Sequence, residues 1–192
     1  MTQWHARCYT WGIRRIYRFH IDVQGLENIP KSPSIFIANH QHALDMAVFG
    51  TVFPAQTVAV FKSDLFWIPF FGLLAKLSGS IFVKRGSLRA RAMIPSCQKA
   101  LEEGTSIWIF PEGTRNKSPQ LLLPFKKGAF HLALASQAPI VPICASRYTA
   151  ASLLKGTIHI QILPPIHPHN SVEATAKDAH NAMQVAVRRL SP

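Results

Sequence analysis

The sequence predicts a single-domain α/β protein with a mostly parallel central sheet flanked by helices. Short apolar runs alternate along the chain with segments of helical periodicity, and this order is typical of a parallel sheet covered by helices. A length of 192 residues suits one domain. No internal repeat or linker-like stretch divides the chain.

Apolar runs of strand length account for the expected sheet. Residues 19–24 alternate between apolar and polar, as in a half-buried strand, and residues 34–38 form a short, continuously apolar run. The same patterns predict strands at 57–61, 80–83, 106–110, 140–145 and 157–163.

Helical patterns lie between these runs, at 43–53, 65–77, 88–103 and 127–136, and Pro95 is expected to kink or shorten the third. The last helix has the clearest pattern, with Asn170 as its predicted cap and Glu173 completing a capping-box-like pair. Its apolar stripe, expected to face the core, consists of Val172, Ala176, Ala179, Met183, Ala186 and Leu190.

Residues 1–18 are predicted to form an amphipathic helix ahead of a domain that spans residues 19–192. The apolar face comprises Ala6, Tyr9, Ile13, Ile16 and Tyr17, opposite Arg7, Arg14 and Arg18 and flanked by Trp4 and Trp11. Two interpretations stay open: a docked helix with a solvated basic face, or a helix on a membrane surface whose arginines meet anionic headgroups.

Composition narrows the class of protein. Hydrophobic residues make up 48% of the chain and charged residues 16%, which excludes a disordered tail. The net charge of +12 attracts anions, but nucleic acid, anionic lipid and phosphorylated partners all fit that charge.

The three cysteines are widely spaced, so no disulfide framework is expected, and Cys144 is predicted to be a buried structural thiol. Neither a signal peptide nor a membrane span is expected; the aromatic run 65–74, if exposed, predicts an interfacial patch.

The first candidate site is the pair His40 and Asp45, which follows the predicted strand 34–38. The carboxyl end of such a strand is the edge where open α/β sheets usually bind ligands. A spacing of five residues across a turn lets the carboxylate accept a proton from one imidazole nitrogen, which leaves the other nitrogen as a general base. A metal site is the alternative, because His40 and His42, like His167 and His169, form His-x-His pairs.

The second candidate site is the polar turn after the strand 106–110. Glu112 stands there beside Gly113, which lets the backbone approach a ligand, and Arg115 offers a fork for phosphate. Further basic residues lie near predicted strand ends or helix starts: Lys62, Lys84, Arg85, Lys126 and Lys127. Phosphate-binding loops, dinucleotide fingerprints, serine elbows and Cys-x-x-Cys pairs are absent from the sequence, so no cofactor is expected and no covalent nucleophile is indicated.

Together these segments resemble the glycerophospholipid acyltransferases of the 1-acylglycerol-3-phosphate acyltransferase (PlsC-like) family. The four ordered blocks are NHQHALD at 39–45, GSIFVKR at 79–85, FPEGTR at 110–115 and VPI at 141–143. Segments 62–72 and 124–129 are also similar, and the match covers roughly residues 20–165.

The resemblance implies transfer of an acyl group from acyl-CoA or acyl carrier protein to the hydroxyl of a lysophospholipid. By position, His40 is the catalytic base and Asp45 supports it, without an acyl-enzyme. The residues implied in substrate binding are Lys62, Arg85, Glu112, Gly113, Thr114 and Arg115. No metal or cofactor is implied, and no nucleic acid partner.

This chain departs from the family pattern at His42, where a small hydroxyl residue is common, and at Lys84, where many members carry Asp or another polar residue. The expected location is the cytoplasmic face of the cell membrane, bound peripherally through an anionic surface. Glycerol 3-phosphate or another lyso-lipid stays open as acceptor. A metal-dependent hydrolase and a basic binding module without turnover are the alternatives from other classes.

Overall fold

The computed structural model describes residues 2–68, 71–83 and 93–191 of the chain. All the predicted apolar runs are confirmed as strands, with bounds that differ by at most one residue at either end. The strands are β1 (His20–Gln24), β2 (Ile35–Ala38), β3 (Thr57–Lys62), β4 (Ile81–Val83), β5 (Ser106–Ile109), β6 (Ile140–Ala145) and β7 (Thr157–Ile162).

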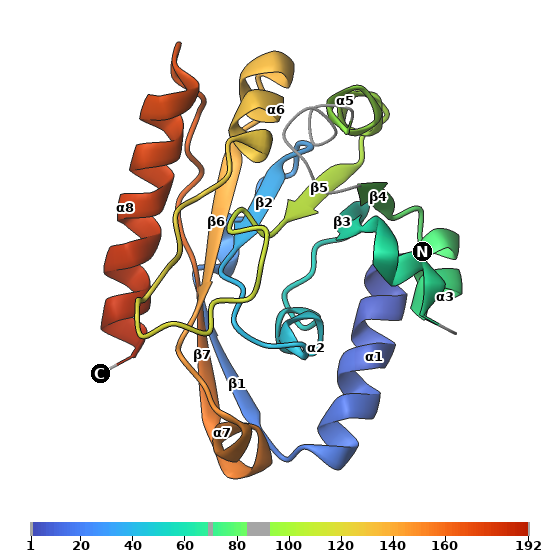
Figure 1. Cartoon of the computed structure of the whole chain (residues 1–192), viewed down its shortest axis with the longest axis vertical. Coiled ribbons are helices and arrows are strands. Elements are labelled where there is room, and N and C mark those ends of the chain that lie inside the picture. Colours follow the sequence, from blue (N-terminus) through green and yellow to red (C-terminus); the bar gives the residue numbers. More distant parts are fainter. Residues whose placement is uncertain (1, 69–70, 84–92, 192) are drawn as a thin grey trace.

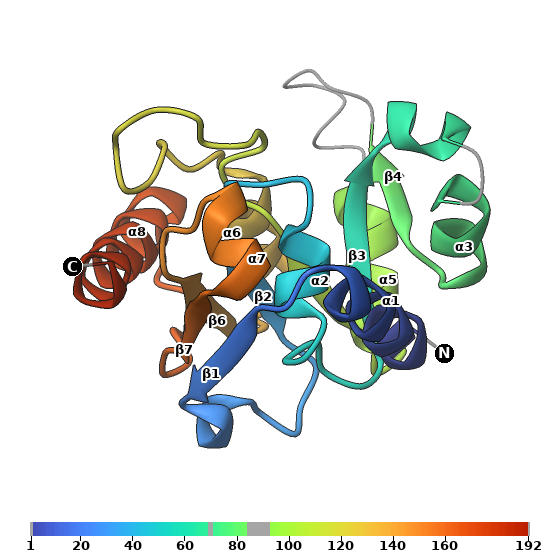
Figure 2. The same cartoon turned by 90° about the horizontal axis from the view of Figure 1, so that it is seen from below.

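Within the described residues, the strands form one sheet in the order β1-β7-β6-β2-β5-β3-β4 (Figures 1 and 2). Neighbouring strands from β6 to β4 pair in parallel, which confirms the predicted mostly parallel sheet. β7 pairs antiparallel with β6, and β1 pairs parallel with β7. β1 and β7 therefore run antiparallel to the other strands of the sheet. The carboxyl ends of β2, β5 and β6 therefore meet at one edge of the sheet.

Helices cover both faces of the sheet. They are α1 (Thr2–Ile16), α2 (Asp45–Phe49), α3 (Phe71–Leu77), α5 (Ile94–Glu102), α6 (Gly128–Ser136), α7 (Ala150–Lys155) and α8 (Val172–Leu190), with short 3-10 turns η1 (Leu26–Asn28) and η2 (Ser63–Trp67). Helices α5, α6 and α8 pack on one face, and α1, α2 and α7 on the other (Figure 2). Because side chains alternate along a strand, Ile35 and Ile37 of β2 enter one apolar cluster, and Phe36 and Ala38 enter the other.

Two predicted helices are shorter than the patterns indicate. The helix expected at 43–53 begins at Asp45 and ends at Phe49, because the residues before Asp45 form a loop that its carboxylate holds. The helix expected at 65–77 is divided into η2 and α3. Ile68 ends η2 in an extended conformation (ψ 120°), as expected for a residue that precedes proline. Pro69 itself lies outside the described residues.

The third predicted helix and α7 show how local capping decides helix bounds. α5 begins at Ile94 with Pro95 in its first turn, where a missing N–H costs nothing. The predicted start at residues 88–92 lies outside the described residues. Helix α7 was not predicted from the sequence; it is a short helix that begins with a reciprocal capping box between Thr149 and Ser152.

Helix α8 begins with Ser171 as its cap, so the predicted cap at Asn170 is wrong. The Ser171 hydroxyl accepts a bond from the Ala174 N–H (3.3 Å), and Ser171 is still extended (φ −135°) where the helix begins. Glu173 forms an ion pair with Lys127 of the neighbouring segment. The predicted core stripe is confirmed, since Ala179 and Met183 are fully buried.

The N-terminal helix α1 is docked on α2. The Thr10 hydroxyl donates to the Ala47 carbonyl (2.9 Å), and Ile13 and Tyr17 pack against the apolar cluster on that face. Ile16 was predicted to share this face, but it is 71% exposed, so that prediction is wrong. No helix among the described residues is both long enough and apolar enough to cross a membrane.

Candidate active site

The candidate site lies at the edge of the sheet where parallel strands end together. Within the paired strands, Ile37 of β2 lies opposite Ile109 of β5, and Ala38 lies opposite Ile143 of β6. His40 and Glu112, which each follow one of these strands by two or three residues, are therefore brought side by side. This is the edge where open α/β sheets bind ligands.

His40 and Asp45 form the hydrogen-bonded pair that the sequence predicts. His40 Nδ1 lies 2.6 Å from Asp45 Oδ2, and the Asp45 carboxylate is only 1% exposed while the His40 side chain is 23% exposed. The imidazole stacks on Phe110, with 4.3 Å between the ring centroids. Because a carboxylate accepts the Nδ1 proton, Nε2 keeps its lone pair and is the nitrogen available as a base.

The Asp45 carboxylate also holds the turn that carries His40. Its oxygens accept the backbone N–H groups of Gln41 (2.7 Å) and His42 (3.1 Å). The Tyr148 hydroxyl donates to Asp45 Oδ1 from the segment that follows β6. Sequence reasoning missed Tyr148, and the signal that could have found it is its place just after a strand that ends at the same edge.

Glu112 is buried (2% exposed) and turned into the protein. Its Oε1 accepts the backbone N–H of His40 (2.8 Å), and its Oε2 accepts the backbone N–H of Leu123 (2.9 Å). Burial raises the pKa of Glu112, and the two backbone bonds oppose that rise. These contacts give Glu112 a positioning role for His40, and its predicted contact with substrate stays a prediction.

The residues after Glu112 face solvent. Gly113 has a φ of +67°, and a Cβ at this position would lie 2.8 Å from the Lys126 side chain, so the turn requires glycine. Thr114 and Arg115 are exposed beside it. Their position leaves both side chains free to meet a ligand at this edge.

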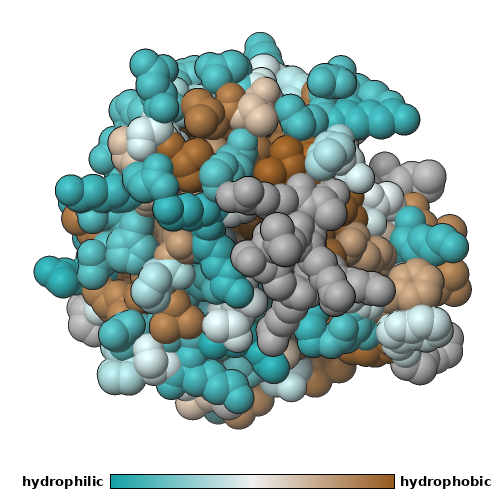
Figure 3. Space-filling model, turned by 45° about the horizontal axis from the view of Figure 1, so that its top comes forward, coloured by the Kyte–Doolittle hydropathy of each residue, from teal (hydrophilic) through white to brown (hydrophobic). Residues whose placement is uncertain are grey.

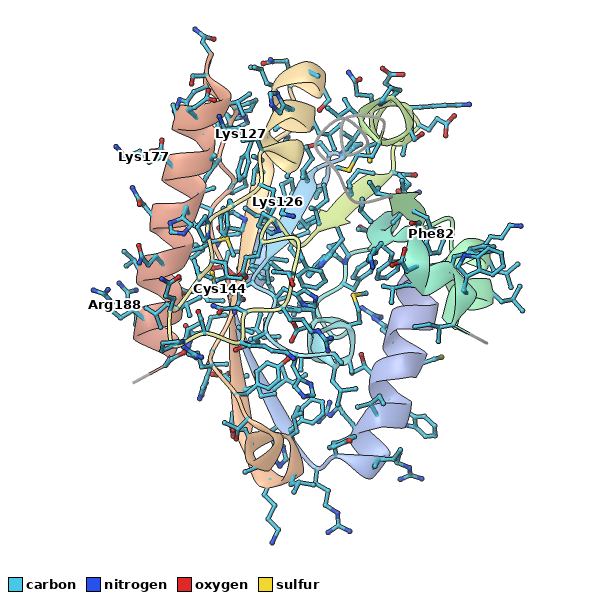
Figure 4. All side chains as sticks on the ribbon, viewed as in Figure 1. Phe82, Lys126, Lys127, Cys144, Lys177 and Arg188 are labelled. Carbon is cyan, nitrogen blue, oxygen red and sulfur yellow. The ribbon has the colours of Figure 1, made fainter. Side chains whose placement is uncertain are left out.

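The other predicted basic residues divide into separate groups. Lys62 ends β3 and forms an ion pair with Asp64. Lys127 forms an ion pair with Glu173, so it faces α8, as its place between α6 and α8 in Figure 4 shows. Lys126 lies nearer the centre of that view, on the loop that leads to α6. Lys84 and Arg85 lie outside the described residues.

The two His-x-His pairs lie at opposite edges of the sheet. His40 follows the end of β2, whereas His167 follows Ile166, which bridges to Ile140 at the start of β6. His42 Nδ1 accepts the Leu44 N–H (3.2 Å). Within residues 2–68, 71–83 and 93–191, no group of three or more His, Cys, Asp or Glu side chains is placed to hold a metal ion. The pairs therefore do not combine into one site.

Cys97 and Cys144 are fully buried, which confirms the prediction for Cys144. Burial raises the pKa of the Cys97 thiol to about 12 and also raises that of Cys144. Both thiols therefore stay protonated at neutral pH and are not nucleophiles there.

A histidine hydrogen-bonded to a buried carboxylate, at the edge where open α/β sheets bind ligands, is an arrangement typical of enzymes that use a general base. The comparisons with known proteins also point to an enzyme. The family model described as Acyltransferase matches residues 20–146, and the chain belongs to this acyltransferase family of enzymes. The resemblance inferred from the four sequence blocks is thus confirmed.

Curated relatives carry a more specific name. The 1-acyl-sn-glycerol-3-phosphate acyltransferase of Saccharomyces cerevisiae is 37% identical over 182 residues, which cover 88% of this chain and 59% of the yeast protein. The alpha enzyme of Homo sapiens is 34% identical and matches 93% of this chain and 68% of its own length. The enzyme of Haemophilus influenzae is 34% identical, and the match covers 99% of this chain and 81% of that protein.

A solved structure has the same fold. The crystal structure of the 1-acyl-sn-glycerophosphate (LPA) acyltransferase PlsC from Thermotoga maritima superposes with a TM-score of 0.79 at 23% identity, and the match covers 98% of this chain and 79% of that one. The chain spans about three fifths (59%) of the yeast relative's length.

Proposed function

We propose that this chain transfers a fatty acyl group to the free hydroxyl of 1-acylglycerol 3-phosphate and so forms phosphatidic acid. The observation that carries the proposal is the 2.6 Å contact between His40 Nδ1 and the buried Asp45 carboxylate, which leaves Nε2 as the base on a side chain that is 23% exposed. The relatives described above are named as 1-acyl-sn-glycerol-3-phosphate acyltransferases, which supports this choice of acceptor.

The reaction needs one base and no acyl-enzyme. His40 Nε2 takes the proton of the acceptor hydroxyl while its oxygen attacks the thioester carbonyl and forms a C–O bond. The tetrahedral intermediate then collapses, the C–S bond breaks, and the thiolate takes the proton back from the imidazolium. Asp45 stabilises that imidazolium throughout.

Positive charge at the same edge suits an anionic acceptor. Arg115 is exposed next to Gly113, and a guanidinium can bind a phosphate with two parallel hydrogen bonds. Lys62 and Arg85 are proposed to contribute to the same phosphate site. The donor is a thioester of CoA or of acyl carrier protein, and both carry phosphate.

The membrane is the proposed source of the acceptor. Exposed apolar side chains belong to α1, η2 and α3 and the residue after η2, and α1 and α3 lie on the right in Figure 1; these side chains include Trp11, Trp67, Ile68, Leu73 and Leu77. Brown hydrophobic atoms lie among hydrophilic ones on the face drawn in Figure 3. Arg14 and Arg15 lie on α1 nearby, with the Arg15 guanidinium 5.3 Å from the Trp11 ring centroid. We propose peripheral binding at the cytoplasmic face, with the aromatic rings at the interface and the arginines on anionic headgroups.

The test is a matrix of acceptors and donors. Purified chain is incubated with 1-acylglycerol 3-phosphate, glycerol 3-phosphate or a zwitterionic lyso-lipid, each with long-chain acyl-CoA or acyl carrier protein, and products are followed by mass spectrometry. Phosphatidic acid as the main product is expected. Preference for glycerol 3-phosphate or the zwitterionic lipid would contradict the acceptor proposed here, and no product in any arm would contradict the reaction class.

A further inference from the structure

We infer that Tyr148 is a positioning residue that sets the orientation and the basicity of His40 through Asp45. The inference rests on the proposed function, since it concerns the base of that reaction. It adds a residue from outside the four sequence blocks, placed three residues beyond the end of β6.

The first argument is the bonding of the Asp45 carboxylate. Among the described residues, it accepts from His40 Nδ1, from the backbone N–H groups of Gln41 and His42, and from the Tyr148 hydroxyl. A carboxylate has about four acceptor positions, so this buried group is saturated. Removing any one donor leaves an unpaired lone pair in a site with almost no access to water.

The second argument is where the donors come from. The other described donors belong to the turn that contains Asp45 itself, whereas Tyr148 is 103 residues away in sequence. It therefore anchors the carboxylate to the sheet rather than to the turn. Three further bonds join the same segments. Gln41 Nε2 donates to the Ser146 carbonyl (2.8 Å), Asn39 Nδ2 donates to the Ala145 carbonyl (3.0 Å), and the Ala145 N–H donates to Asn39 Oδ1 (2.8 Å), but none of these bonds touches the carboxylate.

The third argument is that the phenol is a permanent donor. Tyr148 is only 9% exposed, and burial, followed by the charge and the hydrogen bond of Asp45, raises the pKa of its hydroxyl. The hydroxyl therefore keeps its proton and shares the negative charge of Asp45 with His40. Without it, the full charge acts on the imidazole, which then holds its proton more tightly.

The other groups around His40 and Tyr148 stay in place when Tyr148 is changed, so the lost hydroxyl alone accounts for the expected effect on His40. Asp45 contacts its Nδ1, the Glu112 carboxylate accepts its backbone N–H, Phe110 stacks on its ring, and the His42 ring lies near Tyr148 (6.0 Å between centroids). Tyr148→Phe leaves all of these in place and removes one oxygen. The charge of Asp45 then acts on the imidazole alone, so His40 is expected to hold its proton more tightly in the variant than in wild type.

Two measurements test this inference. In steady-state assays, Tyr148→Phe is expected to lower kcat by about tenfold and to move the acidic limb of the pH profile of kcat/KM to higher pH, with acceptor KM little changed. In NMR titrations of the histidine rings, which need no turnover, the His40 signal is expected to titrate at higher pH in Tyr148→Phe. Tyr17→Phe, which alters a tyrosine packed against the same apolar cluster, is expected to change neither.

Each outcome decides between two roles. A uniform loss of activity at every pH, with an unchanged His40 titration, would show that Tyr148 is merely structural and would overturn the inference. In an Asp45→Asn background, Tyr148→Phe is expected to cause no further shift, because the charge it modulates is gone. If wild type forms no product while the NMR shift is present, the proposed function fails and the role of Tyr148 stands.

Discussion

Two buried carboxylates organise the residues around His40. Asp45 and Glu112 are among only nine acidic residues in the chain, and each is at most 2% exposed. Asp45 bonds the imidazole, and Glu112 bonds the backbone N–H of the same residue. His40 is thus held both at its ring and at its main chain.

Local sequence distance decided which of these contacts could be predicted. His40 and Asp45 lie five residues apart in one turn, so their contact follows from spacing alone. The sequence correctly predicts that Glu112 lies at the ligand-binding edge of the sheet. The direction of its carboxylate depends on the Leu123 N–H, and no sequence pattern predicts that contact. Tyr148 reaches Asp45 only because β6 lies beside β2 in the sheet.

Glu112→Gln is expected to lower both activity and stability. An amide cannot accept both backbone N–H groups, so one is left unpaired at a cost of about 1–3 kcal/mol in the free energy of unfolding. Because burial raises the pKa of Glu112 in the folded state, its contribution to stability is greatest at low pH and is lost as pH rises from the unfolded to the folded pKa.

The stability advantage of wild type over Glu112→Gln is therefore expected to narrow as pH rises through that window. Urea unfolding of both proteins at several pH values between about pH 4.5 and pH 8 measures it. An advantage that widens with pH would contradict the assigned direction of the pKa change.

At the scale of elements, buried strands were predicted better than helix ends. The central strands β2, β5 and β6 are buried on both faces, so hydrophobicity alone marks them. Helix ends depend on which polar side chain reaches a free N–H, as the choice of Ser171 over Asn170 illustrates. The exposure of Ile16 depends on how α1 docks, which periodicity does not specify.

Helix α8 is expected to contribute strongly to stability through one face. Met183 is fully buried between this helix and the sheet, and its carbonyl lies 3.8 Å from Cys144 Sγ. Met183→Ala is expected to reduce the free energy of unfolding by about 2–5 kcal/mol, because it removes buried methylenes and leaves a cavity. Val185→Ala on the opposite face, where Val185 is 60% exposed, is the matched control. Equal losses in chemical denaturation would contradict the packing described for α8.

The membrane proposal concerns η2, α3 and α1 together. Trp67 is 82% exposed, so Trp67→Ser is expected to leave the fold intact. The variant is expected to bind vesicles of phosphatidylethanolamine and phosphatidylglycerol about tenfold more weakly, because it loses about 1.5 kcal/mol of apolar burial in the membrane. Val185→Ser on α8, at the far side of the molecule in Figure 1, is the control. Cosedimentation that finds both variants equal to wild type would contradict this orientation.

At the scale of the whole molecule, the functional features are arranged around one edge of the sheet. His40, Glu112 and Tyr148 follow three adjacent strands at that edge, and the exposed residues Trp11 and Trp67 belong to α1 and η2. The net charge of +12 favours anionic surfaces and anionic substrates alike. The proposed reaction, on a phosphorylated lipid taken from a membrane, would use both features.

The most direct test compares turnover by wild type, His40→Ala and His169→Ala. Purified proteins receive 1-acylglycerol 3-phosphate and long-chain acyl-CoA with a chelator present, and diacyl product is measured by mass spectrometry. His40→Ala is expected to slow turnover by about 10²–10⁴-fold, since it removes the general base. His169→Ala removes a histidine from another His–Asp pair (2.8 Å) at the opposite edge and is expected to match wild type. Retention of most activity by His40→Ala would contradict the account.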